Sequence, residues 1–463
     1  MARSFDNLYI GGSWVPAGAA FDDLNPADGS VWARVADGNS GMAARAIQSA
    51  QEAFAHWSGL HYNERAHYML KVADEFERRR DDLVSALQGE GGGWFGKGMF
   101  ESGYVPEVFR AAAAMTYNAI GEVLPSDHGK ISMATRRPMG VVTVISPWNF
   151  PTLLTARGLA FPIVAGNCVV LKPSEETPYT GGMIFAEIFE AAGVPPGVLN
   201  VVTCSRENVP AVGDIIVEHP LIKGISFTGS TPVGRVIAAK AGAHLKKCCV
   251  ELGGKDALII CDDADMERAT AAANFGSFMH QGQICMSVEK ILVQESVYDE
   301  FLSRFAARAA KLKVGDPSAD NGHVIGPLIN DKQAGKVREQ IEDAWQLLEM
   351  SWVRMRGLGK DAETGEPTAV APLLTFDAFH RLVAAVDNTV LPVGDEHPGA
   401  AYARRAAAAE AELAEKACGA LDKWLAAVEE GGPRAGDGSD DGSEEDEDDS
   451  SEDDSSDESD SDE

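Results

Sequence analysis

The chain has 463 residues, 45% of them hydrophobic, so it can bury the cores of two or three domains. Its formal net charge is −31, and residues 437–463 hold 17 acidic residues without a basic one, which leaves −14 for the rest. This acidic balance disfavours nonspecific binding to nucleic acid and to anionic membranes.

The cysteines and the N-terminus indicate the compartment. The seven cysteines are odd in number and form no CxxC pair, which argues against a disulfide framework and against a zinc site. The N-terminal stretch MARSFDNLYIGGSW has no apolar h-region, and no apolar run in the sequence has transmembrane length. We therefore expect a soluble cytoplasmic protein that binds neither nucleic acid nor membrane.

Helices are expected first along the chain. Apolar residues recur at helical spacing from Ala43 to Phe54, and helical patterns continue to about residue 118. Three glycines at 91–93 interrupt these patterns. Residues 121–137 then predict a strand or hairpin.

Short apolar runs alternate with helical patterns in the middle of the chain, which predicts βαβ units and a parallel sheet. The helices between the runs cover roughly 178–192 and 232–242. A second set begins near Asn274, with a helix that leads to Cys285 and a strand at 290–294. The other predicted strands are 141–145, 168–171, 198–202, 224–227 and 258–261.

The composition changes after about residue 345. Residues 346–398 show no clean period, whereas apolar residues recur every three or four positions in 400–430 and predict a helix. Residues 433–463 are rich in Ser, Asp and Glu, cannot bury a core and are expected to be disordered. Such a tail either solubilises the protein or contacts basic proteins.

One candidate phosphate-binding segment reads FTGSTPVGR, follows a predicted strand and opens a helix. Gly229 permits a tight turn, Ser230 or Thr231 can cap the helix, and Pro232 suits its first turn. Free N–H groups and the helix dipole can then hold a pyrophosphate. Because the segment lacks the GxGxxG pattern, an ordinary capped helix is the alternative.

Two more segments follow predicted strands. Lys172 and Glu175, three residues apart, suit a ribose or adenine site, and the alternative is a solvated turn. In the run SPWNFP two prolines fix the backbone around Asn149, whose amide can donate to a developing oxyanion. The alternative there is a turn that a buried Trp148 anchors.

A cysteine and a glutamate complete the set of candidates. Cys285 ends the stretch HQGQIC and stands 34 residues after Glu251, which opens the stretch ELGGK. A thiolate attacks carbonyl carbons when a base or a positive field favours it. Taken alone, most cysteines are buried small hydrophobes and most glutamates lie on the surface.

These motifs, in this order, resemble those of the aldehyde dehydrogenase superfamily over residues of about 9–344. The resemblance implies that Cys285 is the nucleophile and that Glu251 activates the hydrolytic water. It implies that Asn149 forms an oxyanion hole with the Cys285 N–H. It further implies an NAD site formed by Ser146, Trp148, Lys172, Glu175, Phe227, Gly229, Ser230, Thr231, Pro232, Val233, Gly234 and Leu252.

The function that this resemblance implies is oxidation of an aldehyde to a carboxylic acid through a Cys285 thiohemiacetal and thioester. In the family, residues matching Lys172 and Glu175 bind the adenosine ribose, where a carboxylate disfavours the 2′-phosphate of NADP. The amino-acid sequences of segments 94–110 and 146–157 look most like those of family members that act on benzaldehyde or vanillin, so we expect an aromatic aldehyde as the substrate.

The expected fold class is α/β. A Rossmann-like, parallel-sheet NAD-binding domain at 1–250 includes an oligomerisation hairpin at 121–137, which implies a homo-oligomer. An incomplete catalytic domain at 251–345, a divergent segment at 346–432 and a disordered acidic tail at 433–463 follow.

The family's Glu-x-Phe-Gly-Pro segment, whose glutamate binds the nicotinamide ribose, does not occur in the sequence. Two alternatives to an active enzyme therefore stay open. One is a catalytically impaired homologue that binds NAD. The other is a protein that interacts through its acidic tail and keeps the enzyme-like body as a scaffold.

Overall fold

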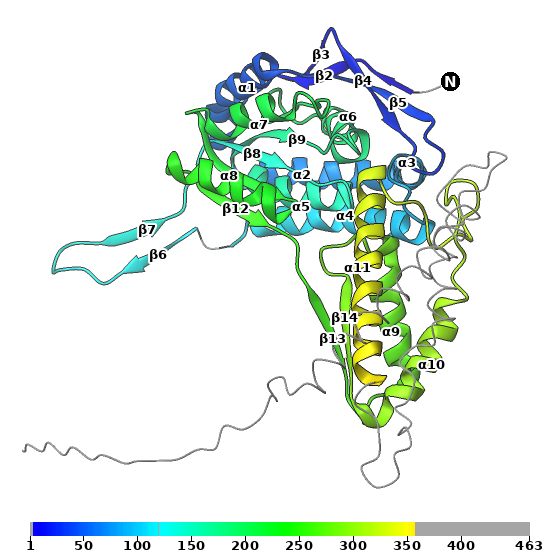
Figure 1. The fold of residues 1–463 in the computed structure, drawn as a ribbon. Coiled ribbons are helices and arrows are strands. Elements are labelled where there is room, and N and C mark those ends of the chain that lie inside the picture. The colour runs from blue at the N-terminus through cyan, green and yellow to red at the C-terminus, as the bar shows by residue number, and fades with distance from the viewer. Residues whose placement is uncertain (1–2, 119, 357–463) are drawn as a thin grey trace, which may run out of the picture. The chain divides into compact units, whose positions relative to one another are not determined.

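The computed structural model describes residues 3–118 and 120–356, which include a seven-stranded sheet (Figure 1). The strand order is β12-β11-β8-β9-β10-β2-β3, and neighbours from β12 to β10 pair in parallel. β2 is antiparallel to β10 and to β3. The strands are β2 (Asn7–Ile10), β3 (Ser13–Pro16), β8 (Val141–Ile145), β9 (Cys168–Lys172), β10 (Leu199–Val201), β11 (Ile222–Thr228) and β12 (Lys247–Glu251).

Helices connect the parallel strands, as the alternating pattern predicts. The predicted helix at 178–192 consists of a π-helical turn, η1, and α6, and the one at 232–242 is α8. The predicted α/β class with a parallel sheet is therefore confirmed. The connecting elements are α5 (Pro151–Val164), η1 (Tyr179–Met183), α6 (Ile184–Ala191), α7 (Val209–Glu218) and α8 (Thr231–Ala243).

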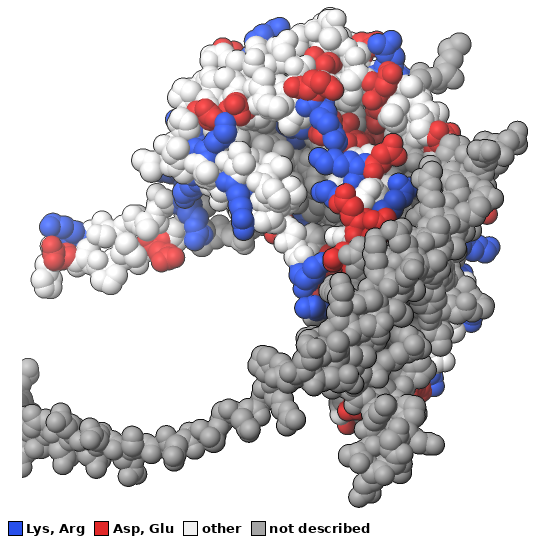
Figure 2. Space-filling view, in the orientation of Figure 1, with Lys and Arg blue, Asp and Glu red and all other residues white. Residues whose placement is uncertain are grey.

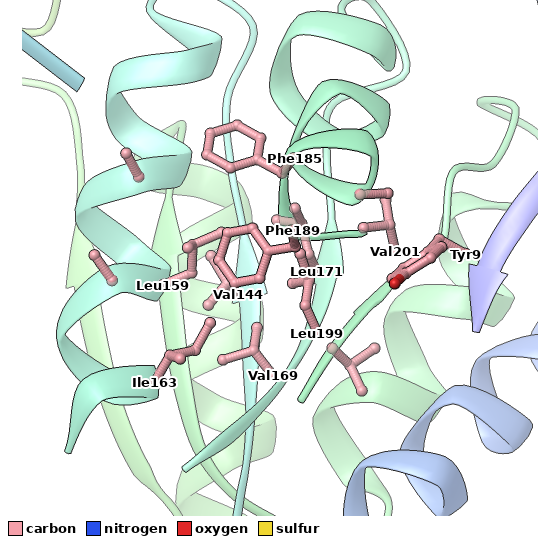
Figure 3. Packing of buried hydrophobic residues seen from close by; sticks show 14 of the residues in the cluster. Tyr9, Val144, Leu159, Ile163, Val169, Leu171, Phe185, Phe189, Leu199 and Val201 are labelled. Atoms are coloured by element: carbon pink, nitrogen blue, oxygen red, sulfur yellow. The ribbon is translucent and has the colours of Figure 1, made fainter. Parts of the chain in front are cut away.

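The sheet is buried on both faces. All five residues of β9 are buried, although successive side chains of a strand point to opposite faces. Figure 3 shows Val144 and Leu171 of the sheet beside Leu159 of α5 and Phe185 and Phe189 of α6. This burial explains why β8 and β9 are continuous apolar runs in the sequence rather than alternating ones.

Four helices lie between the N-terminal strands and β8 in the chain, in agreement with the helices predicted before residue 118. Gly92 ends the third of them with a left-handed φ of 60°, which explains the interruption at the three glycines. The helices are α1 (Ser40–Gly59), α2 (Tyr62–Arg78), α3 (Arg80–Gly91) and α4 (Phe95–Met115).

Three small sheets lie outside the main one in the described residues, and two of them precede β8 in the chain. The predicted hairpin is present as β6 (Gly121–Leu124) and β7 (Ser132–Thr135). The sequence patterns did not predict the sheet of β1 (Arg3–Phe5), β5 (Val31–Ala36) and β4 (Ala20–Leu24). Strands of three to six residues are too short to show a reliable period of two.

A separate βαβ unit follows Glu251. Its helix begins at Met266, so the predicted start near Asn274 is wrong, because Asp265 caps the N–H groups of Glu267 and Arg268. A small apolar cluster of its own includes Ile260, Met266, Ala273 and Phe301. The unit comprises β13 (Asp256–Ile260), α9 (Met266–Phe278) and β14 (Val288–Val293), and α10 (Tyr298–Ala309) packs on it.

The last described element is α11 (Asp331–Arg356). The change in composition at about residue 345 falls inside this helix, so it does not mark the end of an element. The predicted helix at 400–430 and the predicted disordered tail lie outside the described residues. The division into an NAD-binding and a catalytic domain stays a prediction. No helix within 3–118 and 120–356 is long and apolar enough to cross a membrane.

Two buried carboxyl groups lie between α3 and the short sheet at the N-terminus. Glu90 is fully buried and accepts hydrogen bonds from the backbone N–H groups of Tyr179 (2.6 Å) and Thr180 (2.9 Å). Burial raises the pKa of Glu90 to about 7, despite these hydrogen bonds. Burial and the neighbouring Glu90 raise the pKa of Asp23 well above its usual range.

This pair should make stability depend on pH. Because both folded-state pKa values are raised, the stabilising contribution is complete below the unfolded-state values and is lost as the pH rises through the folded-state values. The free energy of unfolding should fall by on the order of 2 kcal/mol between about pH 5 and pH 8. Chemical denaturation at several pH values measures this slope.

Asp23→Asn should flatten the slope, since one of the two acids is then always neutral. Asp22→Asn is the matched control, because Asp22 is the exposed neighbour on the same strand. A slope that Asp23→Asn leaves unchanged would contradict the assignment to this pair.

Candidate active site

Four of the predicted site residues, Ser146, Lys172, Phe227 and Glu251, lie in a row at the carboxyl edge of the main sheet. In the strand pairing, Ile145 lies beside both Lys172 and Phe227, and Thr228 lies beside Glu251. Ser146 continues the row, because its backbone N–H donates to the Lys172 carbonyl at 3.2 Å. Four neighbouring strands therefore end at the same place.

The order of the strands reverses at this edge. The chain runs from β8 to β9 and β10 on one side, and then returns to β11 and β12 on the other. Parallel sheets bind ligands at such a reversal, outside the carboxyl ends of the strands. The segment with Asn149 follows β8 and the segment with Gly229 follows β11, so both border the reversal.

The N-terminus of α8 fits a phosphate. Ser230 precedes the helix in an extended conformation, but no side chain caps it, so the expected Ser230 or Thr231 side-chain cap is wrong. Thr231 opens the helix, and Pro232 and Val233 follow it in the first turn. The first N–H groups, which have no partner within a helix, are thus left for a ligand.

Glycines in this segment make room for packing rather than for an unusual backbone. A Cβ on Gly229 would lie 2.6 Å from the Phe227 ring, and one on Gly234 would lie 2.3 Å from Leu252 Cδ2. Neither glycine has a positive φ, so the backbone of the bend at Gly229 does not itself require glycine. Any larger residue at Gly234 would displace Leu252.

On the other side of β8, three charged residues form one group. The Lys172 Nζ lies 3.4 Å from Glu175 Oε2, and the Arg206 Nη2 lies 3.4 Å from Glu175 Oε1. Burial raises the pKa of Glu175, but the charges of Lys172 and Arg206 outweigh it and the net pKa is lowered. Glu175 is therefore an ionised carboxylate.

Arg206 was not among the residues predicted from the sequence. The residue follows β10, which is the strand next to β9, whereas Lys172 ends β9 and Glu175 follows it. The rule that site residues come after the carboxyl ends of neighbouring strands would have found it.

A hydrogen bond joins Asn149 to the segment before Cys285. The Asn149 Nδ2 donates to the Gln283 carbonyl at 2.9 Å, and the Asn149 Oδ1 accepts from the Phe150 N–H at 3.0 Å. The side-chain amide that the sequence predicts as an oxyanion donor therefore contacts the loop of the predicted nucleophile. Trp148, half-buried beside it, lies with its ring centre 6.5 Å from that of His280.

The loop before Cys285 has a left-handed backbone. His280, Gln281 and Gly282 have φ values of 48°, 57° and 73°. Such a conformation costs about 1–2 kcal/mol for each residue other than glycine, so neighbouring contacts must hold it. The Gln281 Nε2 donates to the Pro327 carbonyl at 2.7 Å, and Gln283 Oε1 accepts from the Ile329 N–H at 3.1 Å.

Cys285 is half-buried, and the segment that follows Glu251 lies next to it. A Cβ on Gly254 would lie 3.4 Å from the Cys285 carbonyl oxygen. The strands after Glu251 and after Cys285 pair in parallel, with Asp256 beside Val288. The exposed Glu251 and the half-buried Cys285 therefore precede the same end of one small sheet. Gly229 donates its N–H to the Glu251 carbonyl at 3.0 Å.

The other five described cysteines vary in burial, and Cys248 is half-buried like Cys285. Cys168 and Cys204 are buried as expected, and burial raises their thiol pKa values to about 12 and about 11. The same expectation is wrong for Cys249 and Cys261, which are exposed. Cys418 lies outside the described residues.

A dinucleotide fits the residues of this edge. The free N-terminus of α8 suits a pyrophosphate, and the ionised Glu175 suits ribose hydroxyls. Ser146 is buried between these two places, and its hydroxyl has no hydrogen-bond partner among the described residues. Such an unpaired buried hydroxyl is consistent with a polar ligand.

The profile of the aldehyde dehydrogenase family matches residues 14–374. The chain belongs to the aldehyde dehydrogenase family. The predicted superfamily and the predicted oxidoreductase class are therefore confirmed. The match continues beyond residue 344, where the motif resemblance ended.

Individual relatives of the chain are also aldehyde dehydrogenases by name. A salicylaldehyde dehydrogenase of Pseudomonas sp. (strain C18) is 38% identical over 343 residues, which are 73% of this chain and 70% of the relative. A benzaldehyde dehydrogenase of Bacillus subtilis (strain 168), YfmT, is 38% identical over 377 residues, which are 81% of this chain and 76% of the relative.

Solved structures with this fold include two that were determined with a bound ligand. The crystal structure of a salicylaldehyde dehydrogenase from Pseudomonas putida G7, complexed with salicylaldehyde, has a TM-score of 0.72 and 37% identity over 75% of this chain and 72% of that one. The crystal structure of PnpE in complex with nicotinamide adenine dinucleotide has a TM-score of 0.71 and 34% identity over 74% of this chain and 70% of that one.

The left-handed turn before Cys285 can be tested with a glycine. Gly282→Ala should cost about 1 kcal/mol of stability, because alanine disfavours a positive φ. It should also change the rate at which iodoacetamide alkylates Cys285 at least about threefold, since the loop must relax. Mass spectrometry of the peptide that contains Cys285 measures this rate.

Gly193→Ala is the matched control, because Gly193 has a φ of 69° and open space around it. It should lose a similar amount of stability without changing the alkylation of Cys285. A Gly282→Ala variant that is alkylated at the wild-type rate would contradict the proposed coupling between the turn and the thiol.

Proposed function

We propose that this aldehyde dehydrogenase uses NAD to oxidise an aromatic aldehyde to a carboxylic acid through a covalent intermediate on Cys285. The observation that carries the proposal is the hydrogen bond from Asn149 to the Gln283 carbonyl. It brings a side-chain donor to the loop of the thiol, while the segment after Glu251 approaches that loop from the other side.

In the first step the Cys285 thiolate attacks the carbonyl carbon, and a carbon–sulfur bond forms as the carbonyl oxygen becomes an oxyanion. The Asn149 amide and the Cys285 N–H donate hydrogen bonds to this oxyanion. NAD, when bound, supplies an acceptor for the hydride, which leaves the thiohemiacetal with two electrons and converts it to a thioester.

In the second step Glu251 takes a proton from a water molecule, which attacks the thioester carbon. The carbon–sulfur bond breaks, which releases the carboxylic acid and restores the Cys285 thiolate, and Glu251 then passes its proton to solvent. Glu251 suits this role because it is exposed at the end of β12, where water reaches it. Among the described residues no hydrogen bond or ion pair occupies its carboxylate, which leaves it free to accept a proton.

Aromatic side chains beside Asn149 support an aromatic substrate. Phe100 and Tyr104 of α4 are exposed to about half of their area, and their rings stack with centres 5.7 Å apart. The Phe100 ring meets the Phe150 ring edge to face at 6.4 Å. Such a wall favours a flat ring, and the relatives' names, salicylaldehyde and benzaldehyde dehydrogenase, agree with it.

The ionised Glu175 favours NAD over NADP, because a carboxylate repels a 2′-phosphate. Arg206 beside it partly offsets that repulsion. A relative named benzaldehyde dehydrogenase [NAD(+)], of Pseudomonas putida, is 38% identical over 334 residues, or 72% of this chain and 68% of the relative.

The hairpin β6–β7 supports a homo-oligomer. Its apolar side chains are exposed, with Ile131 at 83%, and Val123 and Met133 are exposed as well. Exposed apolar groups of this kind favour contact with another copy of the chain. The cytoplasmic location and the contact of the acidic tail with basic proteins stay predictions.

The nucleophile is tested by Cys285→Ala. NADH formation from benzaldehyde should fall by about 10³-fold or more, because no other group forms the covalent intermediate. NAD binding, measured by calorimetry, should not change. Turnover that survives in the variant would refute the proposed nucleophile. NAD binding without turnover by the wild type would select the impaired homologue instead.

Cofactor preference is tested by Glu175→Gln. The variant removes the carboxylate that repels a 2′-phosphate and keeps the positive Arg206 nearby, so the ratio of kcat/KM for NAD to that for NADP should fall at least about tenfold. Glu176→Gln is the matched control, because Glu176 pairs with the same arginine but stands one position further along. An unchanged ratio in Glu175→Gln would argue against Glu175 as the ribose ligand.

A further inference from the structure

Two opposite charges are buried on α4, four residues apart. Lys97 is 1% exposed and Glu101 is 0% exposed, and the Lys97 Nζ lies 2.6 Å from Glu101 Oε1. Removing two charges from water costs several kcal/mol each, and apolar residues of similar size often leave a protein equally or more stable. Stability alone therefore does not account for this ion pair.

Both charges contact the segment that carries the oxyanion donor. The second carboxylate oxygen of Glu101 accepts a hydrogen bond from the Leu153 N–H at 3.0 Å, in the first turn of α5. The Lys97 Nζ lies 4.7 Å from the centre of the Phe150 ring, a favourable distance for a cation above an aromatic face. Asn149 directly precedes Phe150.

His280 links the same segment to the loop of the nucleophile. It is 1% exposed, and its ring centre lies 5.8 Å from that of Phe150 in an edge-to-face arrangement. Burial, followed by the charge of Lys97, holds the pKa of His280 well below its usual range, against an opposite effect of the Asn149 backbone. The imidazole is therefore neutral, and neither ring nitrogen has a hydrogen-bond partner among the described side chains.

We propose that the Lys97–Glu101 pair positions the oxyanion donor: through Phe150, Leu153 and His280 it holds Asn149 against the loop that carries Cys285. The inference rests on the proposed function. Asn149 contacts this loop through its own amide, and its two neighbours in sequence contact His280. Lys97 and Glu101 hold the same segment through the contacts with Phe150 and Leu153. They are positioning residues, because they act on the reaction only through these contacts.

The geometric demand explains why a costly ion pair suits this place. A displacement of about 1 Å at a reacting centre can lower a rate by about 10²-fold. A charge-assisted hydrogen bond in a dry interior is stronger and more directional than an apolar contact. The pair therefore fixes the start of α5 more tightly than methionine or leucine side chains would.

The double variant Lys97→Met, Glu101→Gln tests the proposal. It removes both charges, nearly conserves volume and keeps an oxygen that can accept from the Leu153 N–H. We expect a melting temperature equal to or above that of the wild type and an unchanged Kd for NAD. We expect kcat to fall at least about tenfold and iodoacetamide to alkylate Cys285 at least about three times faster, because the loop loosens.

The control is the double variant Glu107→Gln, Arg110→Met on the same helix. It removes the ion pair of Glu107 with the half-exposed Arg110, whose Nη1–Oε1 distance is 2.8 Å, together with the ion pairs of Arg110 to the exposed Asp74 and Glu77. Surface ion pairs of this kind contribute little to stability. All four measured quantities should stay at their wild-type values.

A folded Lys97→Met, Glu101→Gln variant with wild-type kcat and wild-type alkylation of Cys285 would overturn the proposal. If this variant does not fold, His280→Ala decides, since it keeps the ion pair and removes the ring that links it to the loop. It should lower kcat without changing NAD affinity, and an unchanged kcat would likewise overturn the proposal. A wild type without turnover would count against the proposed function instead, and the alkylation rates would still decide the positioning role.

Discussion

The parallel register of four neighbouring strands is the constraint on which the candidate site depends. Because β12, β11, β8 and β9 end together, the segments that follow them meet at one edge, and the order of the strands reverses there. One hydrogen bond, from Asn149 to Gln283, then joins this edge to the loop of Cys285. Without that register, the proposed cofactor and substrate residues would not share a site.

The site contains features that cost stability. Two left-handed residues before Cys285 and a buried ion pair behind Asn149 each cost on the order of 1–3 kcal/mol or more. The apolar core around β8 and β9 offsets such costs, since burying one large apolar side chain contributes about 1.5–3 kcal/mol. The strained and charged residues therefore lie where the proposed chemistry needs a fixed geometry.

Sequence patterns predicted the parts of the fold in which local and global preferences agree. The continuous apolar runs correctly predicted the positions of β8 and β9 in the sequence, and the motifs identified the family. Lys97 and Glu101 escaped notice because charged residues four apart on a helix usually face solvent, and only tertiary packing buries this pair. The burial of Asp23 was not predicted for a similar reason, because its partner Glu90 is far away in sequence. Arg206 was missed although its place after β10 follows the general rule.

The central claim is that an acyl group resides on Cys285 during turnover. The most direct measurement is the intact mass of a Glu251→Gln variant after mixing with NAD and benzaldehyde, because this variant should form the thioester and hydrolyse it slowly. The account predicts a mass increase of one benzoyl group, located on the peptide that contains Cys285 and absent without NAD. No adduct, or an adduct on another cysteine, from a variant that binds NAD would contradict the account.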